Sequence, residues 1–119
     1  MAPPEAHWRA SLDQGRFLLQ RARASGEAIF PPRIAAPGSG DPDLDWFDAP
    51  SAGTVYSVTI IYPRPPAAPY HVALIDLDAG PRVMSRVDGV APDAVFIGQR
   101  VNARVLIEDD RGLLVFDPS

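Results

Sequence analysis

The sequence predicts a mainly β protein, in which an N-terminal helix and a small ribbon-like hairpin precede a five-stranded Greek-key barrel. Three observations support this fold class. A ten-residue segment with apolar residues on one face ends at Gly15, as expected of a helix. Two short runs with apolar residues before Pro31 indicate a hairpin. From Gly53 to the end, five runs rich in β-branched and aromatic residues alternate with turn formers, which is typical of small antiparallel barrels.

The predicted helix covers residues 5–14. The prolines at 3 and 4 are tolerated in a first turn, because the N–H that proline lacks has no helical partner there. Gly15 is a common residue just past a helix end. Trp8 and Leu12 lie one turn apart and share a face. A helix this short is marginal in water by itself. We therefore expect that face to cover the domain or to dock on a partner subunit, and the pattern leaves both open.

Two short strands are predicted next, over residues 16–21 and 27–30. The pair Pro31-Pro32 ends the second, because proline cannot continue a strand ladder. Residues 35–45 are rich in glycine, proline and aspartate and contain few apolar side chains. We expect this loop to be loose unless a metal or a partner holds it. The large side chains that could hold the region by packing are Phe30, Trp46 and Phe47.

The barrel strands are expected in five segments bounded mostly by glycine or proline: 54–62, 70–78, 82–88, 100–108 and 113–116. In the fourth segment, apolar residues at odd positions from Val101 to Ile107 alternate with polar ones, so one face is predicted to be buried. Residues 63–69 contain four prolines and form a stiff loop. A turn or short helix is expected at 92–96. The predicted division of the chain is 1–15 for the helix, 16–48 for the ribbon and 49–119 for the barrel.

Composition narrows the function classes. The 119 residues carry a formal net charge of −4, and 46% are hydrophobic, which is ordinary for one globular domain. All eleven basic residues are arginine, so Schiff-base chemistry, which needs a lysine amine, is excluded for this chain. An excess of acidic residues weakens binding to polyanions, so nucleic acid is not the expected partner. No apolar run approaches the roughly 20 residues of a membrane span, and residues 1–5 lack a signal-peptide pattern. We therefore expect a cytoplasmic protein without a membrane partner.

Two four-residue segments repeat one spacing. Ala22-x-x-Ser25 and Ala36-x-x-Ser39 are ten residues apart, and a glycine follows each serine. A four-thiolate zinc ribbon carries its Cys-x-x-Cys pairs at this kind of spacing, because two tight turns let four sulfurs reach one tetrahedral ion. This chain contains no cysteine. The spacing is therefore that of a zinc ribbon whose four ligands are missing, and we expect no bound zinc.

The residues around these segments carry a resemblance: Phe17-Leu-Leu-Gln-Arg21, Ile29-Phe-Pro-Pro-Arg33, Leu44-Asp-Trp46 and Gly53-Thr-Val-Tyr-Ser57. In that order they resemble a family of small bacterial and archaeal proteins with an N-terminal helix, a rubredoxin-like zinc ribbon and a C-terminal OB-fold. The family pattern reads approximately L-L-x-Q-R-C-x-x-C-G, then F-P-P-R-x-x-C-P-x-C-G, then G-x-V-Y-S. The match runs from about Trp8 to the end. It departs at the four metal positions: Ala22, Ser25, Ala36 and Ser39.

The resemblance implies a function. Family members are companion subunits of thiolase-like enzymes, aldolases or hydratases that handle acyl-CoA. We therefore expect a non-catalytic accessory subunit that docks on such an enzyme and positions or shields the CoA-linked substrate, with no tightly bound cofactor and acyl-CoA as a possible ligand. Arginine pairs well with two phosphate oxygens, and an aromatic ring offers a flat apolar surface. The residues expected to bind the cofactor are Arg33, Phe30, Tyr56 and Arg86, with Arg64 and Arg82 as further phosphate candidates.

Other interpretations remain open. Phe30 and Tyr56 could be plain core residues, and Arg33 could pair with an aspartate nearby. A stand-alone hydrolase or thioesterase could use His71 with Ser57 or Ser85, although the G-x-S-x-G pattern is absent. An OB-fold can also bind single-stranded nucleic acid through exposed aromatics, here Tyr56 and Tyr62. The acidic loop with Asp41, Asp43, Asp45 and Asp48 does not fit a calcium site, because no glutamate closes it.

Overall fold

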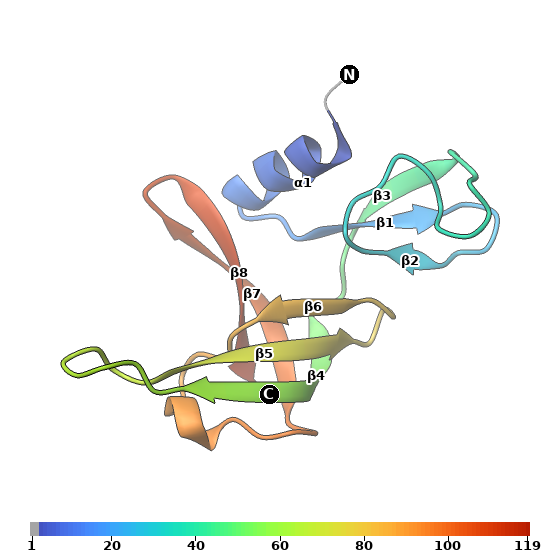
Figure 1. The fold of residues 1–119 in the computed structure, drawn as a ribbon. Helices are drawn as coiled ribbons and strands as arrows, with labels where there is room; N and C mark the ends of the chain where they lie inside the picture. The colour runs from blue at the N-terminus through green and yellow to red at the C-terminus, as the bar shows by residue number, and fades with distance from the viewer. Residues whose placement is uncertain (1–2) are drawn as a thin grey trace. The chain divides into compact units, whose positions relative to one another are not determined.

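The computed structural model describes residues 3–119 and shows one α-helix, one short 3₁₀ helix and eight strands in that range (Figure 1). Met1 and Ala2, which the predicted first segment and the signal-peptide argument include, lie outside the described residues. Within the described part, no helix is long and apolar enough to cross a membrane. The chain divides into two compact units. The first contains residues 3–50, 79–81 and 105–114, and the second contains 51–78, 82–104 and 115–119. The division into 1–15, 16–48 and 49–119 remains a prediction.

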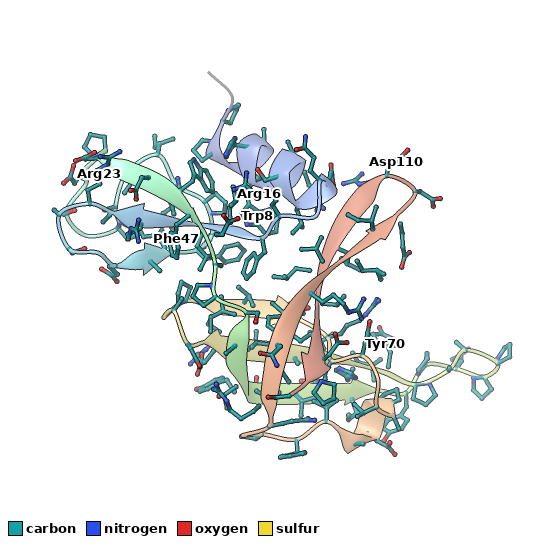
Figure 2. The ribbon with its side chains drawn as sticks, turned by 180° about the vertical axis from the view of Figure 1, so that it is seen from behind. Trp8, Arg16, Arg23, Phe47, Tyr70 and Asp110 are labelled. Carbon is teal, nitrogen blue, oxygen red and sulfur yellow. The ribbon has the colours of Figure 1, made fainter. Side chains whose placement is uncertain are left out.

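Helix α1 spans Pro4–Asp13, so the helix predicted over 5–14 is confirmed to within one residue at each end. Gly15 follows with φ +84°, a conformation that favours glycine, and its N–H donates to the Leu12 carbonyl at 2.9 Å. The shared face of the helix is turned toward the protein. Leu12 is 1% exposed, and the Trp8 indole N–H donates to the Leu18 carbonyl at 3.0 Å (Figure 2).

The first unit contains a three-stranded antiparallel sheet with the order β2-β1-β3. Strand β1 is Leu18–Ala22, β2 is Ala28–Ile29 and β3 is Leu44–Asp48. The first two correspond to the predicted hairpin, although β2 has only two residues. We predicted no strand at β3. Its sequence L-D-W-F-D has no clean alternation, and its pairing with β1, such as Gln20 opposite Trp46, joins segments far apart in the chain.

The second unit is built on a five-stranded sheet with the order β6-β5-β4-β7-β8. Its strands are β4 (Ala52–Ile61), β5 (Tyr70–Leu77), β6 (Arg82–Ser85), β7 (Arg100–Glu108) and β8 (Arg111–Pro118), and the short helix η1 is Pro92–Ala94. Strand β4 pairs with β5 from Gly53 opposite Leu77 to Ile61 opposite Tyr70, and a register shift between Val55 and Ser57 marks a bulge. Each predicted barrel segment overlaps one of these strands, although β4 begins two residues before the predicted 54–62 and β8 extends beyond the predicted 113–116 at both ends.

The barrel closes where the chain beyond β6 meets β8. Val87 forms a parallel bridge with Phe116. The Phe116 N–H donates to Arg86 O at 3.0 Å, and the Asp88 N–H donates to Phe116 O at 2.7 Å. Inside, the side chains buried to 3% exposure or less include Val55, Ala73, Ile75, Leu77, Val83, Val87, Val101, Val115 and Phe116. The result is a nearly closed five-stranded antiparallel barrel consistent with an OB-fold, as predicted.

The tip of the β7–β8 hairpin belongs to the first unit. The Gly112 N–H donates to Asp13 Oδ1 at 2.8 Å, and Arg9 donates to the Gly112 carbonyl. The backbone at Gly112 approaches helix α1 so closely that a Cβ atom there would overlap the Leu12 carbonyl. Glycine is required at this position because the helix end and the hairpin meet backbone to backbone.

Candidate functional site

The two repeated segments of the sequence form two turns of the same kind. In the first turn, the Gly26 N–H donates to Ala22 O at 2.7 Å and the Ala22 N–H donates to Glu27 O at 3.0 Å. The Glu27 N–H also donates to Ser25 Oγ at 3.2 Å. Each of these bonds spans the same number of residues as a bond in the second turn.

In the second turn, the Gly40 N–H donates to Ala36 O at 2.9 Å and the Ala36 N–H donates to Asp41 O at 2.8 Å. The Asp41 N–H donates to Ser39 Oγ at 3.3 Å. Both glycines have a positive φ, +76° for Gly26 and +71° for Gly40. The loop predicted over 35–45 is therefore built around a hydrogen-bonded turn, and it meets the first turn through apolar contacts.

Ala22 and Ala36 are buried together with Ile29 in one cluster, and Leu44 packs against it. These four residues, Ala22, Ile29, Ala36 and Leu44, form what we call the apolar cluster. Its two alanines stand at positions where the zinc-ribbon spacing places metal ligands. Within residues 3–119, no group of three or more histidine, cysteine, aspartate or glutamate side chains is placed to hold a metal ion. The two turns, residues 22–27 and 36–41, which we call the twin turns, are thus connected by apolar packing. This is the interaction that alanine, isoleucine and leucine side chains can supply.

A buried amide holds the segment that follows β2. Gln20 on β1 is only 4% exposed. Its Nε2 donates to the Arg33 carbonyl at 2.7 Å, and its Oε1 accepts from the Arg33 N–H at 2.6 Å. Both polar atoms of the side chain are therefore used on a single residue. These two bonds hold the backbone of Arg33 in place, so the point at which its side chain leaves the backbone is fixed.

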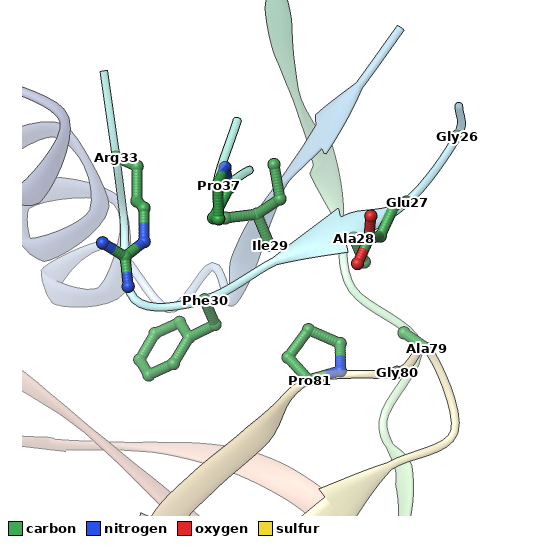
Figure 3. A pocket seen from close by; sticks show the side chains of 10 residues that line it. All are labelled: Gly26, Glu27, Ala28, Ile29, Phe30, Arg33, Pro37, Ala79, Gly80 and Pro81. Atoms are coloured by element: carbon green, nitrogen blue, oxygen red, sulfur yellow. The ribbon is translucent and has the colours of Figure 1, made fainter. Parts of the chain in front are cut away.

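Arg33 and Phe30 line the same pocket, which has a volume of about 360 Å³ (Figure 3). Two of the four residues predicted to bind a cofactor are therefore brought together. The remaining wall comes from residues 26–29, Pro37 and residues 79–81. Phe30 is half-buried, and its ring lies 5.5 Å from the Trp8 ring, so it serves both as a packing residue and as part of the pocket wall.

Arg33 differs from most arginines of the chain in its charge environment. Eight of the eleven form ion pairs with aspartates: Arg9, Arg16, Arg21, Arg23, Arg82, Arg86, Arg100 and Arg104. Among residues 3–119, Arg33 has no ion pair. The alternative interpretation, that Arg33 forms a salt bridge with a nearby aspartate, therefore does not hold within that range. Arg64 and Arg111 are likewise without an ion pair in that range. Of these three, Arg33 is the one that lines this pocket.

A second hollow, of about 320 Å³, also has Arg33 in its wall. Its other residues include Trp46 and Ile34, and Ile34 is 80% exposed. The ring of His7 lies 4.7 Å from the Trp46 ring, at an angle of 51°. Arg33 therefore lines both hollows.

The other two predicted cofactor residues belong to the second compact unit and do not line these hollows. Tyr56 is 49% exposed, which excludes it from the core, and the Arg82 guanidinium lies 3.4 Å from the centre of its ring. Arg82 also donates to Asp76 at 2.6 Å. Arg86 is paired with Asp88 at 2.8 Å. These guanidiniums are already engaged by carboxylates, which lowers their availability to a phosphate.

His71 is buried at 8% exposure beside Val87. Its Nε2 accepts the Val87 N–H at 2.9 Å, whereas no described residue bonds to its Nδ1. Burial lowers the pKa of His71 below the ordinary 6.5, against the opposing effect of Asp88. Because its Nε2 accepts the backbone N–H of Val87, this imidazole is fixed at the barrel seam, the contact between the segment after β6 and strand β8. It lines a small pocket with Tyr70 and Arg86, to which neither Ser57 nor Ser85 contributes.

Comparison with known proteins supports one family. The family described as "ChsH2, C-terminal OB-fold domain" matches residues 46–106. A chain from a solved structure titled "Ltp2-ChsH2(DUF35) aldolase" is 33% identical and superimposes with a TM-score of 0.83, covering 99% of this chain and 96% of that one. A DUF35 protein of unknown function from Sulfolobus solfataricus has a TM-score of 0.71 at 19% identity, over 100% of this chain and 87% of that one. This second likeness shows the fold alone.

The chain is also similar in sequence to several known proteins. The "Probable enoyl-CoA hydratase alpha subunit" of Thermomonospora curvata is 35% identical over 99 residues, which cover 81% of this chain and 31% of that protein. This chain thus spans about a third of the length of that relative. A "DUF35 domain-containing scaffold protein" of Pyrococcus furiosus is 26% identical over 118 residues, covering 92% of this chain and 85% of the relative. The chain belongs to the family of proteins with the ChsH2 C-terminal OB-fold domain, the DUF35 family.

Proposed function

We propose that this protein is a non-catalytic accessory subunit of an enzyme complex that processes acyl-CoA. The single observation that supports this best is the likeness, over nearly the full length of both chains, to a chain of the structure titled "Ltp2-ChsH2(DUF35) aldolase". A second relative is named as a hydratase subunit, and a third as a scaffold protein. A scaffold role also agrees with the chemistry of the chain, because its one buried histidine is bonded to the backbone of the barrel seam.

In this proposal the partner subunit carries the catalytic groups and is an aldolase, a hydratase or a thiolase-like enzyme. Helix α1 and the three-stranded sheet dock on it, and the OB-fold barrel positions or shields the CoA-linked substrate. The binding groups of this chain are the guanidinium of Arg33 and the ring of Phe30, which line one pocket. The guanidinium supplies two parallel N–H donors to phosphate oxygens, and the ring supplies a flat apolar surface.

We further propose that the twin turns are the remnant of a zinc ribbon, with the apolar cluster in place of the metal. The matching hydrogen bonds of the two turns support this, because they place residues 22, 25, 36 and 39 in equivalent positions of equivalent turns. An alanine side chain offers zinc no ligand atom, and a serine hydroxyl binds zinc poorly compared with a thiolate. Contacts of Ile29 and Leu44 with the two alanines would then replace the stabilisation that a metal gives to a ribbon.

The direct test is native co-purification of the tagged chain from its source cells, followed by mass spectrometry. We expect one acyl-CoA enzyme in stoichiometric amount. The matched variant carries Ala6→Glu and Ala10→Arg at exposed positions of α1, which leave its buried face intact and should lose the enzyme if that helix docks. Recovery of the wild-type chain without any acyl-CoA enzyme, or retention of single-stranded nucleic acid in its place, would contradict the proposal.

A further inference from the structure

We propose that the barrel seam is a pH-sensitive contact, which opens when the Nε2 atom of His71 takes up a proton. In its neutral form, His71 accepts the Val87 N–H and so connects strand β5 to the segment after β6, residues 86–88. The imidazolium cannot accept at that atom, so the segment loses its bond to β5. This inference is independent of the proposed function, because it concerns bonds within the barrel alone.

The position of His71 follows from the register of β5 and β6. The pairing of these strands ends at Ala73 opposite Ser85. Two residues further along the same register, His71 would lie opposite Val87. There the imidazole takes the place of the backbone, since its Nε2 accepts the Val87 N–H at 2.9 Å. A titratable side chain thus occupies the place of a carbonyl that would continue the ladder.

The same segment is held on its other side by β8. Arg86 O accepts the Phe116 N–H at 3.0 Å, and the Asp88 N–H donates to Phe116 O at 2.7 Å. The N–H of Val87, between these two residues, is directed to His71 instead, as expected when successive amides of an extended segment alternate in direction. The segment therefore lies between the imidazole and β8, and both sides hold it.

The bond to Val87 determines which nitrogen of the neutral imidazole carries the proton. Because Nε2 accepts a hydrogen bond, the proton is on Nδ1. Nδ1 is buried, and no described residue accepts a bond from it. A buried donor without a partner is unfavourable. The neutral ring thus has one hydrogen bond to the described residues, and this bond exists only while Nε2 is unprotonated.

Protonation turns this bond into a conflict between two donors. An Nε2–H would face the Val87 N–H with the two nitrogens 2.9 Å apart, and the charged ring would be only 8% exposed. The ring lines a hollow of about 220 Å³ together with Tyr70, which gives it a route toward solvent. Once the ring has moved, Val87 has lost its acceptor on the β5 side, although its side chain is 2% exposed.

The contacts that would then remain are weak. They are the two backbone bonds to Phe116 and the ion pair between Arg104 and Asp88, with a separation of 3.4 Å. This ion pair is partly exposed to solvent, and such pairs contribute little to stability. Loss of the bond to His71 therefore removes a substantial part of what holds the segment, and the seam opens.

The charges around the seam do not offset the burial of a positive ring. The titratable and charged side chains there are Tyr70, Arg86, Asp88, Arg104 and Asp117, with Asp93 on η1, which packs against β5. Asp88 favours the imidazolium, whereas Arg86 opposes it. Strand β4 carries no charged residue. Burial has the largest effect and lowers the pKa of His71, so the neutral ring is favoured while the seam is closed.

Amide hydrogen exchange of the purified chain, followed by NMR between about pH 5 and 8, tests the proposal. After correction for intrinsic exchange rates, the opening constants of the Val87, Asp88 and Phe116 amides should rise together below about pH 6.5. The rise should be at most about tenfold per pH unit, because opening takes up one proton. The Val55 N–H, which donates to Gln99 O elsewhere in the barrel, is the reference amide and should not respond.

The matched variant is His71→Gln. Its Oε1 can accept the Val87 N–H in place of Nε2, and the amide does not titrate. It should therefore keep the Val87 amide protected and abolish the pH dependence. The ¹⁵N chemical shifts of the imidazole in the wild type are a second measurement, which needs no substitution. They should show the proton on Nδ1 above about pH 6.5.

Several results would overturn the inference. If the opening constants of Val87, Asp88 and Phe116 stay constant relative to Val55 as the pH falls, the seam does not respond to protonation. If Val55 opens to the same extent, the whole barrel unfolds and the seam is not a separate element. A proton on Nε2 at neutral pH, or a pH response that persists in His71→Gln, would show that this nitrogen does not control the seam.

Discussion

Both polar atoms of the Gln20 side chain bond to the peptide of Arg33, at 2.6 and 2.7 Å, in a region where Gln20 is 4% exposed. A buried amide with two short bonds to one residue ties β1 to the segment after β2. It also fixes the backbone of Arg33, whose guanidinium has no ion pair among residues 3–119. This contact connects the stability of the ribbon region with the proposed binding site.

Gln20→Ala should therefore lower the free energy of unfolding by about 1–3 kcal/mol, because it removes the two hydrogen bonds to the Arg33 peptide, each of which contributes about 0.5–1.5 kcal/mol. Chemical denaturation measures this change. The matched control is Gln14→Ala, at an exposed position just after α1, which should change stability by less than about 0.5 kcal/mol. Equal effects of the two substitutions would show that the Gln20–Arg33 contact does not stabilise the fold.

Gly112→Ala should destabilise the protein by about 1–3 kcal/mol, since the added methyl group would overlap the Leu12 carbonyl and push the hairpin away from α1. The same movement would weaken the bond from the Gly112 N–H to Asp13. Thermal unfolding of the variant measures the loss, with Arg111→Ala on the same strand as the control. An unchanged melting temperature for Gly112→Ala would mean that the hairpin and the helix end are not packed as described.

The pH dependence of stability should report on His71. Burial lowers its pKa below 6.5, so the unfolded state takes up a proton first as the pH falls. The stability that the neutral imidazole supplies is present above about pH 6.5 and is lost as the pH falls through the lower pKa of the folded state. Urea denaturation between about pH 5 and 8 should show this decline in the wild type and not in His71→Phe. A His7→Gln variant keeps His71 and controls for the loss of one histidine, so it should retain the decline.

Removal of metal should have no effect on the fold if the apolar cluster has replaced a zinc ion. We expect less than one equivalent of zinc by metal analysis, and the same unfolding curve with and without a chelator. Ile29→Ala, which truncates the cluster, should cost about 2–5 kcal/mol. A full equivalent of bound zinc, or a chelator effect as large as that of Ile29→Ala, would contradict the metal-free interpretation.

The sequence was most informative where a pattern is local. The alternation in β7 and the Gly15 stop of α1 are properties of neighbouring residues, and the strand and the helix end are both confirmed. The buried face predicted for β7 holds only at its start, because Val101 is fully buried whereas Ile107 is 46% exposed. Strand β3 was missed because its partner β1 lies more than twenty residues earlier and its own sequence does not alternate. The sites divide in the same way. Phe30 and Arg33 are three residues apart and share a pocket. The hydrogen bonds from Gln20 to Arg33, in contrast, depend on the folded position of the segment after β2, which the spacing of the residues does not indicate.

The arginines illustrate a further limit of sequence reasoning. Arg33, Arg82 and Arg86 are chemically equal as phosphate ligands in the sequence. Only the folded chain shows that Arg82 and Arg86 are paired with aspartates and that Arg33 is not paired with a described carboxylate. Ion pairing depends on side chains brought together across strands, such as Asp76 opposite Arg82, and this register follows from the barrel as a whole.

The central claim, that this protein is an accessory subunit whose partner carries the chemistry, is tested most directly by reconstitution. The co-purifying acyl-CoA enzyme is separated from this chain, and turnover of its acyl-CoA substrate is measured for each component alone and for the recombined complex. We expect no turnover by this chain alone and restoration of activity when it is added back to the partner. Turnover of an acyl-CoA by the isolated chain, or full activity of the partner without it, would contradict the proposed accessory role.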